Sequence, residues 1–399
     1  MMPDSAYLIV GGGMTAAAAA RGIREVDPDG SIGVIGTEAD PPYKRPLLSK
    51  GLWNGKSFDD VWSKTSDLGL DLHLGRTARW LDSRAKRVVD DRGTAYGFDK
   101  LLLATGSSPR RLPIDNNGIV YLRTLQDYRR LRQLAGAGRR FAVVGGGFIG
   151  TEIAAALTSN GNKVVMIFPG PAIGDGLFPV DLGLWLNEFY RERGVEVLAG
   201  ATVVDATARG DESFVRVQTL AGGESEIAVD GIVAGIGTEP NVELARSGGL
   251  AVEDGIVVDR FLRTNRPDIY AAGDVANFRV CALGERRRIE HEDNAKTMGR
   301  VAGRAMAGRP EPYDHLPFFY SDLFDLGYEA VGDVDPRLET VADWTEPYRT
   351  GVVYYLREGR VRGVLLWNVW DQIEAARELI GQPGRFGPAE FTGRLAPGR

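Results

Sequence analysis

Near its N-terminus the chain carries a glycine-rich turn that joins an apolar run to a helix-forming run, a connection typical of parallel α/β sheets. The apolar run 7–10 leads into Gly11-Gly12-Gly13-Met14-Thr15-Ala16, and the alanines of 17–20 come directly after it. Another apolar run, 32–35, follows the alanines. This order predicts a strand, a helix and a second strand parallel to the first.

The same arrangement occurs a second time. The apolar run 141–144 leads into Gly145-Gly146-Gly147-Phe148-Ile149-Gly150, followed by a helical stretch over 151–157 and an apolar run over 164–167. A single motif of this kind is a weak signal, because 52 of the 399 residues are glycine, about twice the usual share. Two copies in the same context predict two dinucleotide-binding βαβ units.

Each position of the turn has a physical reason. The first glycine permits the tight turn, the second lets the backbone approach a pyrophosphate, and a small third residue lets the helix pack on the strand. The N-terminus of the helix then faces the phosphates. Ala16 and Gly150 are the small third residues of the two copies. Two such sites predict FAD in one unit and NAD(P) in the other, so that a hydride passes to a ring that releases single electrons.

The cysteine and histidine content excludes several redox chemistries. The single cysteine, Cys281, cannot form an intramolecular disulfide, a dithiol pair or a cluster-binding set. The three histidines, His73, His291 and His315, lie far apart in the sequence without metal-binding spacing. We therefore expect no bound metal.

Charge and hydropathy indicate which partners to expect. The net charge of −6 gives no basic surface for nucleic acid. No apolar run approaches the length of a membrane span, and the first residues show no cationic and apolar leader. We expect a cytoplasmic protein that binds neither nucleic acid nor a membrane.

Four motifs resemble the FAD/NAD-linked reductases, a family that includes NADH:ferredoxin and rubredoxin reductases and apoptosis-inducing-factor-like proteins. The motifs are Pro42-Tyr43-Lys44-Arg45-Pro46-Leu47-Leu48-Ser49-Lys50, Leu103-Ala104-Thr105-Gly106, Gly235-Ile236-Gly237-Thr238-Glu239-Pro240-Asn241 and Tyr270-Ala271-Ala272-Gly273-Asp274-Val275. The resemblance implies an α/β fold with two nested Rossmann-like dinucleotide-binding domains, like glutathione reductase, and a C-terminal α+β domain. The implied domains are a discontinuous FAD-binding domain (1–112 and 239–317), an NAD(P)-binding domain (113–238) and the C-terminal domain (318–399).

The C-terminal part looks like that of apoptosis-inducing factor. The segments that carry this likeness are Glu290-His291-Glu292-Asp293-Asn294-Ala295, Tyr320-Ser321-Asp322-Leu323, Gly327-Tyr328-Glu329-Ala330, 351–357 and 366–368. Two departures stand out: the family usually has Trp where Tyr320 stands, and the long insertion of the animal apoptotic proteins between Tyr328 and Gly351 is absent. A cell-death function carried by that insertion is therefore not expected.

The residues of this part also predict a hairpin and a helix. Val352, Tyr354 and Leu356 alternate along one run, a turn follows at Glu358-Gly359, and the next apolar run covers 364–366. The stretch 371–380 predicts a closing helix.

The resemblance assigns roles to residues in these motifs. Lys50 and Glu152 are the expected catalytic residues, which pair near flavin N5 and position the reacting rings. For the charged residues the structural alternative is a solvated loop charge or a helix-dipole partner, and for Tyr320 it is core packing. The expected cofactor-binding residues are Gly11, Gly13, Met14, Thr15, Ala16, Thr37, Glu38, Arg45, Lys50, Ala104, Thr105, Gly106, Gly145, Gly147, Phe148, Ile149, Gly150, Glu152, Gly237, Gly273, Asp274, Glu290, His291 and Tyr320.

One of these positions has two candidates. The adenine ribose of FAD requires an acid at the end of the second strand of its βαβ unit. Glu38 has the required chemistry, whereas the family's spacing to Tyr43 places the position at Thr37. The sequence therefore offers both Glu38 and Thr37 as candidates for the ribose-binding residue.

Together these features predict an FAD-dependent NAD(P)H oxidoreductase. A hydride passes from NADH to flavin N5, and the electrons then go to an external acceptor such as ferredoxin or rubredoxin, a small acidic carrier protein. The basic residues Arg286-Arg287-Arg288 would suit such a partner, with a solvated charged loop as the alternative. The alternative function is an apoptosis-inducing-factor-like redox sensor that interacts with a partner and forms a long-lived reduced FAD–NAD+ complex.

NADH is expected over NADPH because the sequence places no cation for a 2′-phosphate. Pro169-Gly170-Pro171 follows the second strand of the second unit, relatives usually carry Glu at the Gly170 position, and the next arginine is Arg191. A 2′-phosphate would lack the charge-assisted bonds that arginine provides. We expect modest discrimination, since the acid that rejects the phosphate is also missing.

Overall fold

The computed structural model describes residues 4–114, 116, 118–209 and 212–395. The prediction that the chain has no leader rests partly on Met1–Pro3, and these three residues lie outside the described ranges. The chain divides into two compact units, each made of segments that are separate in the sequence. Unit 1 contains residues 1–45, 58–108 and 239–317, and unit 2 contains residues 46–57, 109–238 and 318–399.

Unit 1 is built on a seven-stranded sheet that begins with the first predicted strand. Its strands and the two helices beside it are β1 (Asp4–Val10), α1 (Met14–Arg24), β2 (Ile32–Gly36), β3 (Leu70–Leu74), β4 (Ala78–Asp82), β5 (Arg87–Asp90), β6 (Ala95–Leu103), β18 (Ile269–Ala271) and α6 (Glu292–Met306). The strand order is β3-β2-β1-β6-β5-β4, and β18 also pairs with β6. β1 and β2 pair in parallel, with Tyr7 opposite Ile32, which confirms the first predicted βαβ unit.

Short elements complete unit 1. They are η1 (Arg45–Leu48, which continues into unit 2), η2 (Phe58–Val61), η3 (Ser66–Leu68), α5 (Glu243–Ser247), β16 (Val252–Glu253), β17 (Gly255–Val257), η4 (Gly273–Val275), β19 (Ala276–Val280), η5 (Cys281–Leu283) and β20 (Glu285–Arg288). Strands β16, β17, β19 and β20 form a four-stranded sheet in that order. The connecting strands β7 (Ser107–Pro109) and β15 (Thr238–Pro240) pair with each other where the chain leaves and re-enters the unit.

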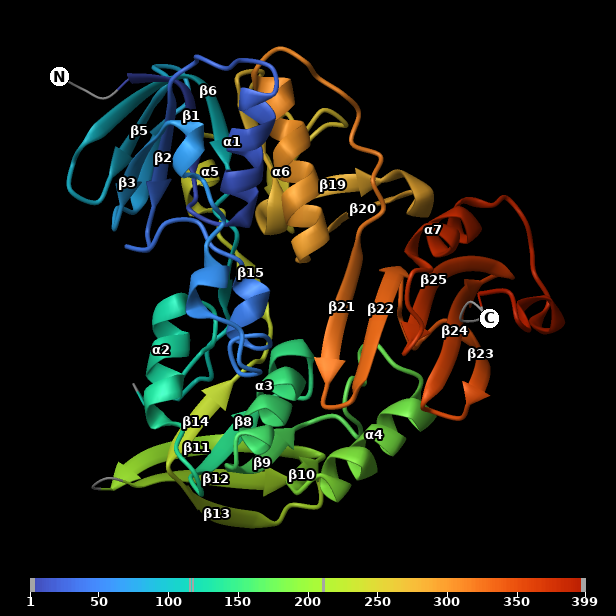
Figure 1. Cartoon of the computed structure of the whole chain (residues 1–399). Helices are drawn as coiled ribbons and strands as arrows, with labels where there is room; N and C mark the ends of the chain where they lie inside the picture. The colour runs from blue at the N-terminus through green and yellow to red at the C-terminus, as the bar shows by residue number, and fades with distance from the viewer. Residues whose placement is uncertain (1–3, 115, 117, 210–211, 396–399) are drawn as a thin grey trace. The chain divides into compact units, whose positions relative to one another are not determined.

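Helices α1 and α6 lie side by side in unit 1 (Figure 1). Their backbones approach closely because glycines stand at the crossing. A methyl group built on Gly303 would lie 2.1 Å from the Ala19 carbonyl oxygen, and one on Gly22 would lie 2.1 Å from the Arg300 oxygen. The glycines of α6 and the alanines of α1 therefore form one tightly packed interface.

Unit 2 contains the second predicted βαβ unit. Its first elements are α2 (Leu125–Leu134), β8 (Arg140–Val144), α3 (Phe148–Ser159), β9 (Lys163–Phe168), α4 (Val180–Glu192), β10 (Val195–Ala199), β11 (Ala201–Arg209), β12 (Glu212–Thr219), β13 (Glu224–Val229) and β14 (Gly231–Ala234). The parallel sheet β10-β9-β8-β14 has Phe141 opposite Val164, as the sequence pattern predicts. Buried residues of β8 and β9, including Val144 and Val165, form one core with Val215 and Val217 of the sheet β11-β12-β13.

The C-terminal part of unit 2 is a five-stranded antiparallel sheet. Its elements are β21 (Phe318–Leu323), β22 (Leu326–Gly332), β23 (Glu339–Glu346), β24 (Thr350–Arg357), β25 (Arg360–Trp367), α7 (Ile373–Gly381) and η6 (Pro388–Phe391), in the strand order β21-β22-β25-β24-β23. The hairpin β24–β25 confirms the prediction, with Glu358 and Gly359 in the turn. The closing helix begins at Ile373 rather than residue 371, because Asp371 has φ +62°, which a right-handed helix excludes. Phe319 of β21 packs edge-on against Phe148 of α3, with ring centroids 5.2 Å apart.

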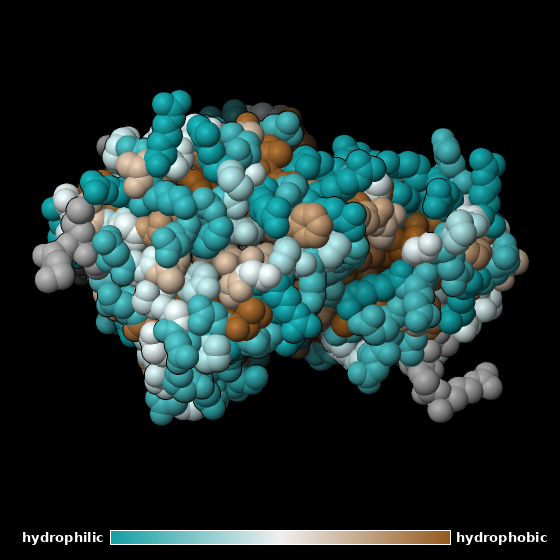
Figure 2. Space-filling model, turned by 90° about the horizontal axis from the view of Figure 1, so that it is seen from above, coloured by the Kyte–Doolittle hydropathy of each residue, from teal (hydrophilic) through white to brown (hydrophobic). Residues whose placement is uncertain are grey.

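The surface is mixed in character. On the face shown in Figure 2, hydrophilic residues cover most of the area and hydrophobic residues lie among them in small groups. Among the described residues, no helix is both long enough and apolar enough to cross a membrane.

The contact between α1 and α6 generates a stability prediction. Gly303→Ala should lower the melting temperature of the protein, because overpacking a close helix crossing typically costs about 1–3 kcal/mol. Thermal unfolding followed by circular dichroism measures the shift. Gly381→Ala is the matched control, since a methyl group at this α7 position meets no described atom within 4 Å. An equal or larger loss of stability in the control would contradict the explanation.

Candidate functional site

The first glycine turn ends at the N-terminus of α1 in unit 1. Gly11 has φ +126°, and a side chain there would lie 2.0 Å from the Ala104 carbonyl oxygen, so the protein itself requires this glycine. Gly13, the N-cap of α1, has φ −96°, a conformation open to any residue. A side chain on Gly13 would meet, among the described atoms, only Arg45 Nη2 at 4.0 Å.

The second glycine turn repeats this geometry in unit 2. Gly145 has φ +115°, and a side chain there would lie 2.3 Å from the Gly235 oxygen. Gly150 packs against the Gly145 carbonyl, where a methyl group would lie 2.0 Å from the oxygen. Gly147, the N-cap of α3, has φ −89°, and a side chain there would meet no described atom within 4 Å.

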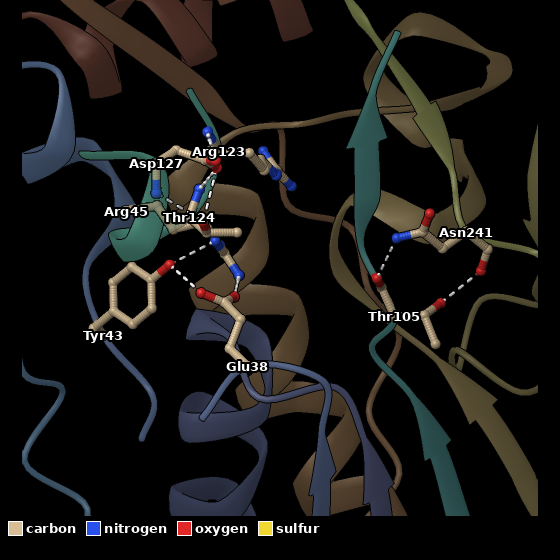
Figure 3. A network of polar contacts seen from close by, with 8 residues as sticks. All are labelled: Glu38, Tyr43, Arg45, Thr105, Arg123, Thr124, Asp127 and Asn241. Carbon is tan, nitrogen blue, oxygen red and sulfur yellow. Dashed lines mark hydrogen bonds and ion pairs between the residues drawn. The ribbon is translucent and has the colours of Figure 1, made fainter. Parts of the chain in front are cut away.

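The N-termini of α1 and α3 differ from that of α2. Thr124 caps α2: its Oγ1 accepts from Asp127 N at 3.1 Å, and the Asp127 carboxylate accepts from Thr124 N at 2.8 Å (Figure 3). In the described part of the chain, α1 and α3 have neither a side-chain cap nor an acid in the first turn. Their first backbone N–H groups can therefore bind an external anion.

Arg45 lies near the first turn and pairs with Glu38, one of the two candidates for the ribose position. Arg45 Nη2 donates to Glu38 Oε1 at 2.6 Å, and the Tyr43 hydroxyl donates to Glu38 Oε2 at 2.6 Å (Figure 3). Thr37, the other candidate, directly follows β2 and is exposed. In this structure the Glu38 carboxylate has protein partners on both oxygens.

Two further predicted segments lie against the first turn or β6 in unit 1. Gly273 has φ +77°, and a side chain there would lie 2.3 Å from Thr15 Oγ1, so η4 closely approaches the start of α1. Thr105 is tied to Asn241 by two bonds, Thr105 Oγ1 to the Asn241 oxygen at 2.7 Å and Asn241 Nδ2 to the Thr105 oxygen at 2.8 Å (Figure 3). The predicted segments 104–106 and 273–274 are thus held on the scaffold of unit 1.

A buried ion pair is the main polar feature of unit 2. Lys50 Nζ lies 3.0 Å from Glu152 Oε1, and these side chains are 10% and 5% exposed. Lys50 also donates to the Tyr320 carbonyl oxygen at 3.1 Å, and its Nζ lies 4.0 Å from the centroid of the Tyr320 ring. The structure thus brings together Lys50 and Glu152, the pair that the resemblance implies, and places Tyr320 beside Lys50.

Two serines complete the partners of Glu152, and the sequence analysis missed both. Ser49 Oγ donates to Glu152 Oε2 at 2.5 Å, and Ser321 Oγ donates to Oε1 at 2.6 Å. Ser49 and Ser321 are themselves buried. A buried carboxylate is stable only when it is paired and hydrogen-bonded, so these donors hold Glu152 in a defined position. Their only sequence signal is that each neighbours a predicted residue, Lys50 or Tyr320.

Glu290 and His291 stand at the start of α6 in unit 1. Arg288 pairs with Glu290, and His291 is the N-cap of α6. Burial lowers the pKa of His291 to about 4, although the charges of Asp274, Glu290 and Asp293 oppose this shift. The imidazole is therefore neutral at pH 7.

The predicted site residues fall into two sets. Arg45, Asp274 and His291 belong to unit 1 with the first turn, whereas Lys50, Glu152 and Tyr320 belong to unit 2 with the second turn; Gly237, whose oxygen accepts from Arg110 N at 2.9 Å, also lies in unit 2. No group of three or more His, Cys, Asp or Glu side chains among the described residues is arranged to hold a metal ion.

Comparison with known proteins gives consistent matches over nearly the whole chain. Residues 5–299 match the pyridine nucleotide-disulphide oxidoreductases, and residues 302–347 and 343–382 match the C-terminal domain of mitochondrion-associated apoptosis-inducing factor. Apoptosis-inducing factor 1, mitochondrial, of Dictyostelium discoideum is 33% identical over 94% of this chain and 78% of its own length. The ferredoxin–NAD(+) reductase component of the anthranilate 1,2-dioxygenase system of Burkholderia cepacia is 35% identical over 98% of each chain.

A solved structure is also similar. The reductase in the covalent putidaredoxin reductase–putidaredoxin complex has a TM-score of 0.89 and 28% identity, and the match covers 98% of this chain and 95% of that one. This match confirms the predicted fold class of two dinucleotide-binding units with a further C-terminal domain.

The lowered pKa of His291 predicts a specific titration. The His291 ring should stay neutral from pH 8 to pH 5 and titrate near pH 4, which NMR of histidine-labelled protein measures, with His291→Gln identifying the resonance. Below pH 6.5 the unfolded chain binds a proton that the folded chain does not, so this residue destabilises the fold as pH falls. At pH 5 the penalty is about 2 kcal/mol, and His291→Gln should remove it. A His291 midpoint near 6.5 would contradict the assignment.

Proposed function

The chain belongs to the pyridine nucleotide-disulphide oxidoreductase family, and on that premise we propose that NADH reduces its FAD and that a small electron-carrier protein takes the electrons. It is a flavoprotein oxidoreductase of the electron-transfer type. The family name refers to disulfide chemistry, but this chain has one cysteine, Cys281, so its acceptor is not a dithiol pair within the chain.

The geometry of Gly13 and Gly147 carries the proposal. Both are helix N-caps with a backbone conformation that any residue can adopt, and both leave room for a side chain within the described protein. The fold alone does not require glycine at either position. Close approach of a pyrophosphate to the backbone would require it, which supports one dinucleotide at each turn.

The residues around the first turn fit a diphosphate. Arg45 Nη2 lies 4.0 Å from the position where a Gly13 side chain would begin, so its guanidinium, which also pairs with Glu38, lies beside the positive end of α1 and can donate to a phosphate there. Asp274, in the middle of η4, would accept from ribityl hydroxyls, while Glu38 or Thr37 would accept from the hydroxyls of the adenine ribose. FAD, when bound, accepts a hydride and releases electrons one at a time.

The ion pair of unit 2 would serve the reacting rings. Glu152 is held by Ser49, Ser321 and Lys50, which leaves little freedom to its carboxylate. Lys50, fixed between Glu152 and Tyr320, would place a positive charge at a defined position. The proposed role of the pair is to orient the nicotinamide and to set the local charge. Correct orientation of the two rings favours hydride transfer from the nicotinamide to the flavin.

The external acceptor is proposed from the similar proteins. One relative is named as a ferredoxin–NAD(+) reductase component, and one similar structure is a reductase joined to putidaredoxin. The arginine triad of β20 is bonded within unit 1: Arg286 to the Val258 and Asn277 oxygens, Arg287 to Glu285, and Arg288 to Glu290. Two of the three charges are paired with acids and Arg286 is held by backbone carbonyl oxygens, so the triad gives no support for a carrier-binding surface. The sensor alternative is not favoured, since the reductase component matches this chain along its full length.

Valine substitutions at the two N-caps test the two dinucleotide sites. Gly13→Val should raise the dissociation constant for FAD at least tenfold and lower the FAD content of the purified protein, because a clash of about 1.4 kcal/mol or more lowers affinity by that factor. Gly147→Val should keep the FAD but raise the KM for NADH by a similar factor. Absorbance at 450 nm and steady-state kinetics measure these effects. The two variants control for each other, and full FAD content with unchanged KM in both would reject the proposal.

Alanine substitutions test the ion pair. Glu152→Ala and Lys50→Ala should each slow flavin reduction by NADH about 10- to 100-fold, since hydrogen bonds to charged groups contribute about 1.5–3 kcal/mol. Both variants should retain FAD. The double variant should be no slower than the worse single variant, because the two groups act as one pair. Anaerobic stopped-flow mixing measures the rates, and wild-type reduction rates in both single variants would exclude the proposed role.

A further inference from the structure

The end of β9 lacks the acid that an NADH site normally presents. In a dinucleotide-binding βαβ unit, an Asp or Glu after the second strand accepts hydrogen bonds from the adenine-ribose hydroxyls. In this chain Pro169-Gly170-Pro171 follows the strand, and none of these residues has a polar side chain.

The loop that follows turns back toward the glycine turn. Gly174 N donates to the Gly146 oxygen at 2.9 Å, which joins the loop directly to the predicted pyrophosphate site. The buried Asn187 of α4 fixes the same loop, because its Oδ1 accepts from Ile173 N at 3.0 Å and its Nδ2 donates to the Pro171 oxygen at 2.9 Å. The loop therefore has a defined course beside the end of β9.

This course places the Asp175 carboxylate over Gly170. A Cβ atom built on Gly170 would lie 1.9 Å from Asp175 Oδ2 and 2.6 Å from its Cγ. The carboxylate thus occupies the space into which a side chain at position 170 would project. Asp175 is exposed, and within the described part of the chain its carboxylate has neither a hydrogen bond nor an ion pair.

The nearest arginine in the sequence does not offset this negative charge. Arg191 Nη2 donates to the Val197 oxygen at 2.9 Å, and Nη1 pairs with Glu188 on the same helix. The Arg191 guanidinium is thus held by α4 and β10, whereas the Asp175 carboxylate is available to a ligand.

We infer that Asp175 accepts the adenine-ribose hydroxyls of the nicotinamide dinucleotide and makes the protein select NADH over NADPH. The carboxylate replaces, from a loop, the acid that the strand end lacks. A 2′-phosphate would meet the negative charge of Asp175 and lose the hydroxyl donor, so NADPH would bind more weakly. This inference rests on the proposed function, because it assigns a residue of the same NADH site.

Neutralisation of Asp175 in the FAD-loaded protein tests the inference. Asp175→Asn should lower the ratio of kcat/KM for NADH to that for NADPH about tenfold, through KM with kcat nearly unchanged, since the contact lies away from the reacting ring. Glu192→Gln removes one exposed charge at the end of α4 and should leave the ratio unchanged. The FAD content should stay the same in both variants.

A double variant moves the acid back to the strand end. Gly170→Glu combined with Asp175→Ala should restore the NADH preference, because the truncated side chain at position 175 leaves the space to a carboxylate from position 170. An unchanged ratio in Asp175→Asn, an equal drop in Glu192→Gln, or a wild-type preference for NADPH would overturn the inference.

The same measurements separate this inference from the proposed function. If wild-type protein with bound FAD is reduced by neither nucleotide, the proposed function fails and the role of Asp175 fails with it. If NADH reduces the wild type rapidly but Asp175→Asn leaves the ratio unchanged, only the role of Asp175 is lost.

Discussion

The Glu152 carboxylate holds together three parts of unit 2 that are far apart in the sequence. Ser49 and Lys50 come from the segment 46–57, Glu152 from α3, and Ser321 from β21. Removing one donor would leave a buried charge incompletely paired, which destabilises the fold far more than an unpaired charge on the surface does. These bonds tie the segment 46–57 and the C-terminal sheet to the second βαβ unit, with which both share unit 2. The contacts that stabilise the buried Glu152 carboxylate in the fold are therefore the same contacts that would hold it in position for the proposed reaction.

The two glycine turns repeat one local geometry, to which the proposed function assigns different ligands. In both, the first glycine is required by the protein's own backbone, whereas Gly13 and Gly147 have open space beside them. Differences in chemistry come from side chains outside the turns: Arg45 beside the first, Asp175 beside the second. Under the proposed function, the turns define where a dinucleotide binds, and side chains outside the turns define which dinucleotide binds.

Much of this organisation could be predicted from the sequence, because strand, turn and helix are local patterns. The two βαβ units and the β24–β25 hairpin follow from apolar runs and glycine positions within a few residues. Ser321 and Asp175 could not be found in this way. Ser321 reaches Glu152 across 169 residues of sequence, and Asp175 acts at Gly170 only because the loop is fixed by Asn187 and Gly146. The start of α7 differs from the predicted residue 371 for a local reason, since the positive φ of Asp371 has no signature in the apolar pattern.

The glycine-mediated contact of α1 with α6 also constrains how unit 1 can form during synthesis. At about 5–20 residues per second, a ribosome needs roughly 13–54 s to travel from Arg24, the end of α1, to Glu292, the start of α6. During that interval the small-residue face of α1 has no partner, while β8, β9 and β14 have already emerged and can pair. The N-terminal unit is therefore completed after the inserted parallel sheet, and a nascent chain that stops before Gly303 leaves the first glycine turn without its supporting helix.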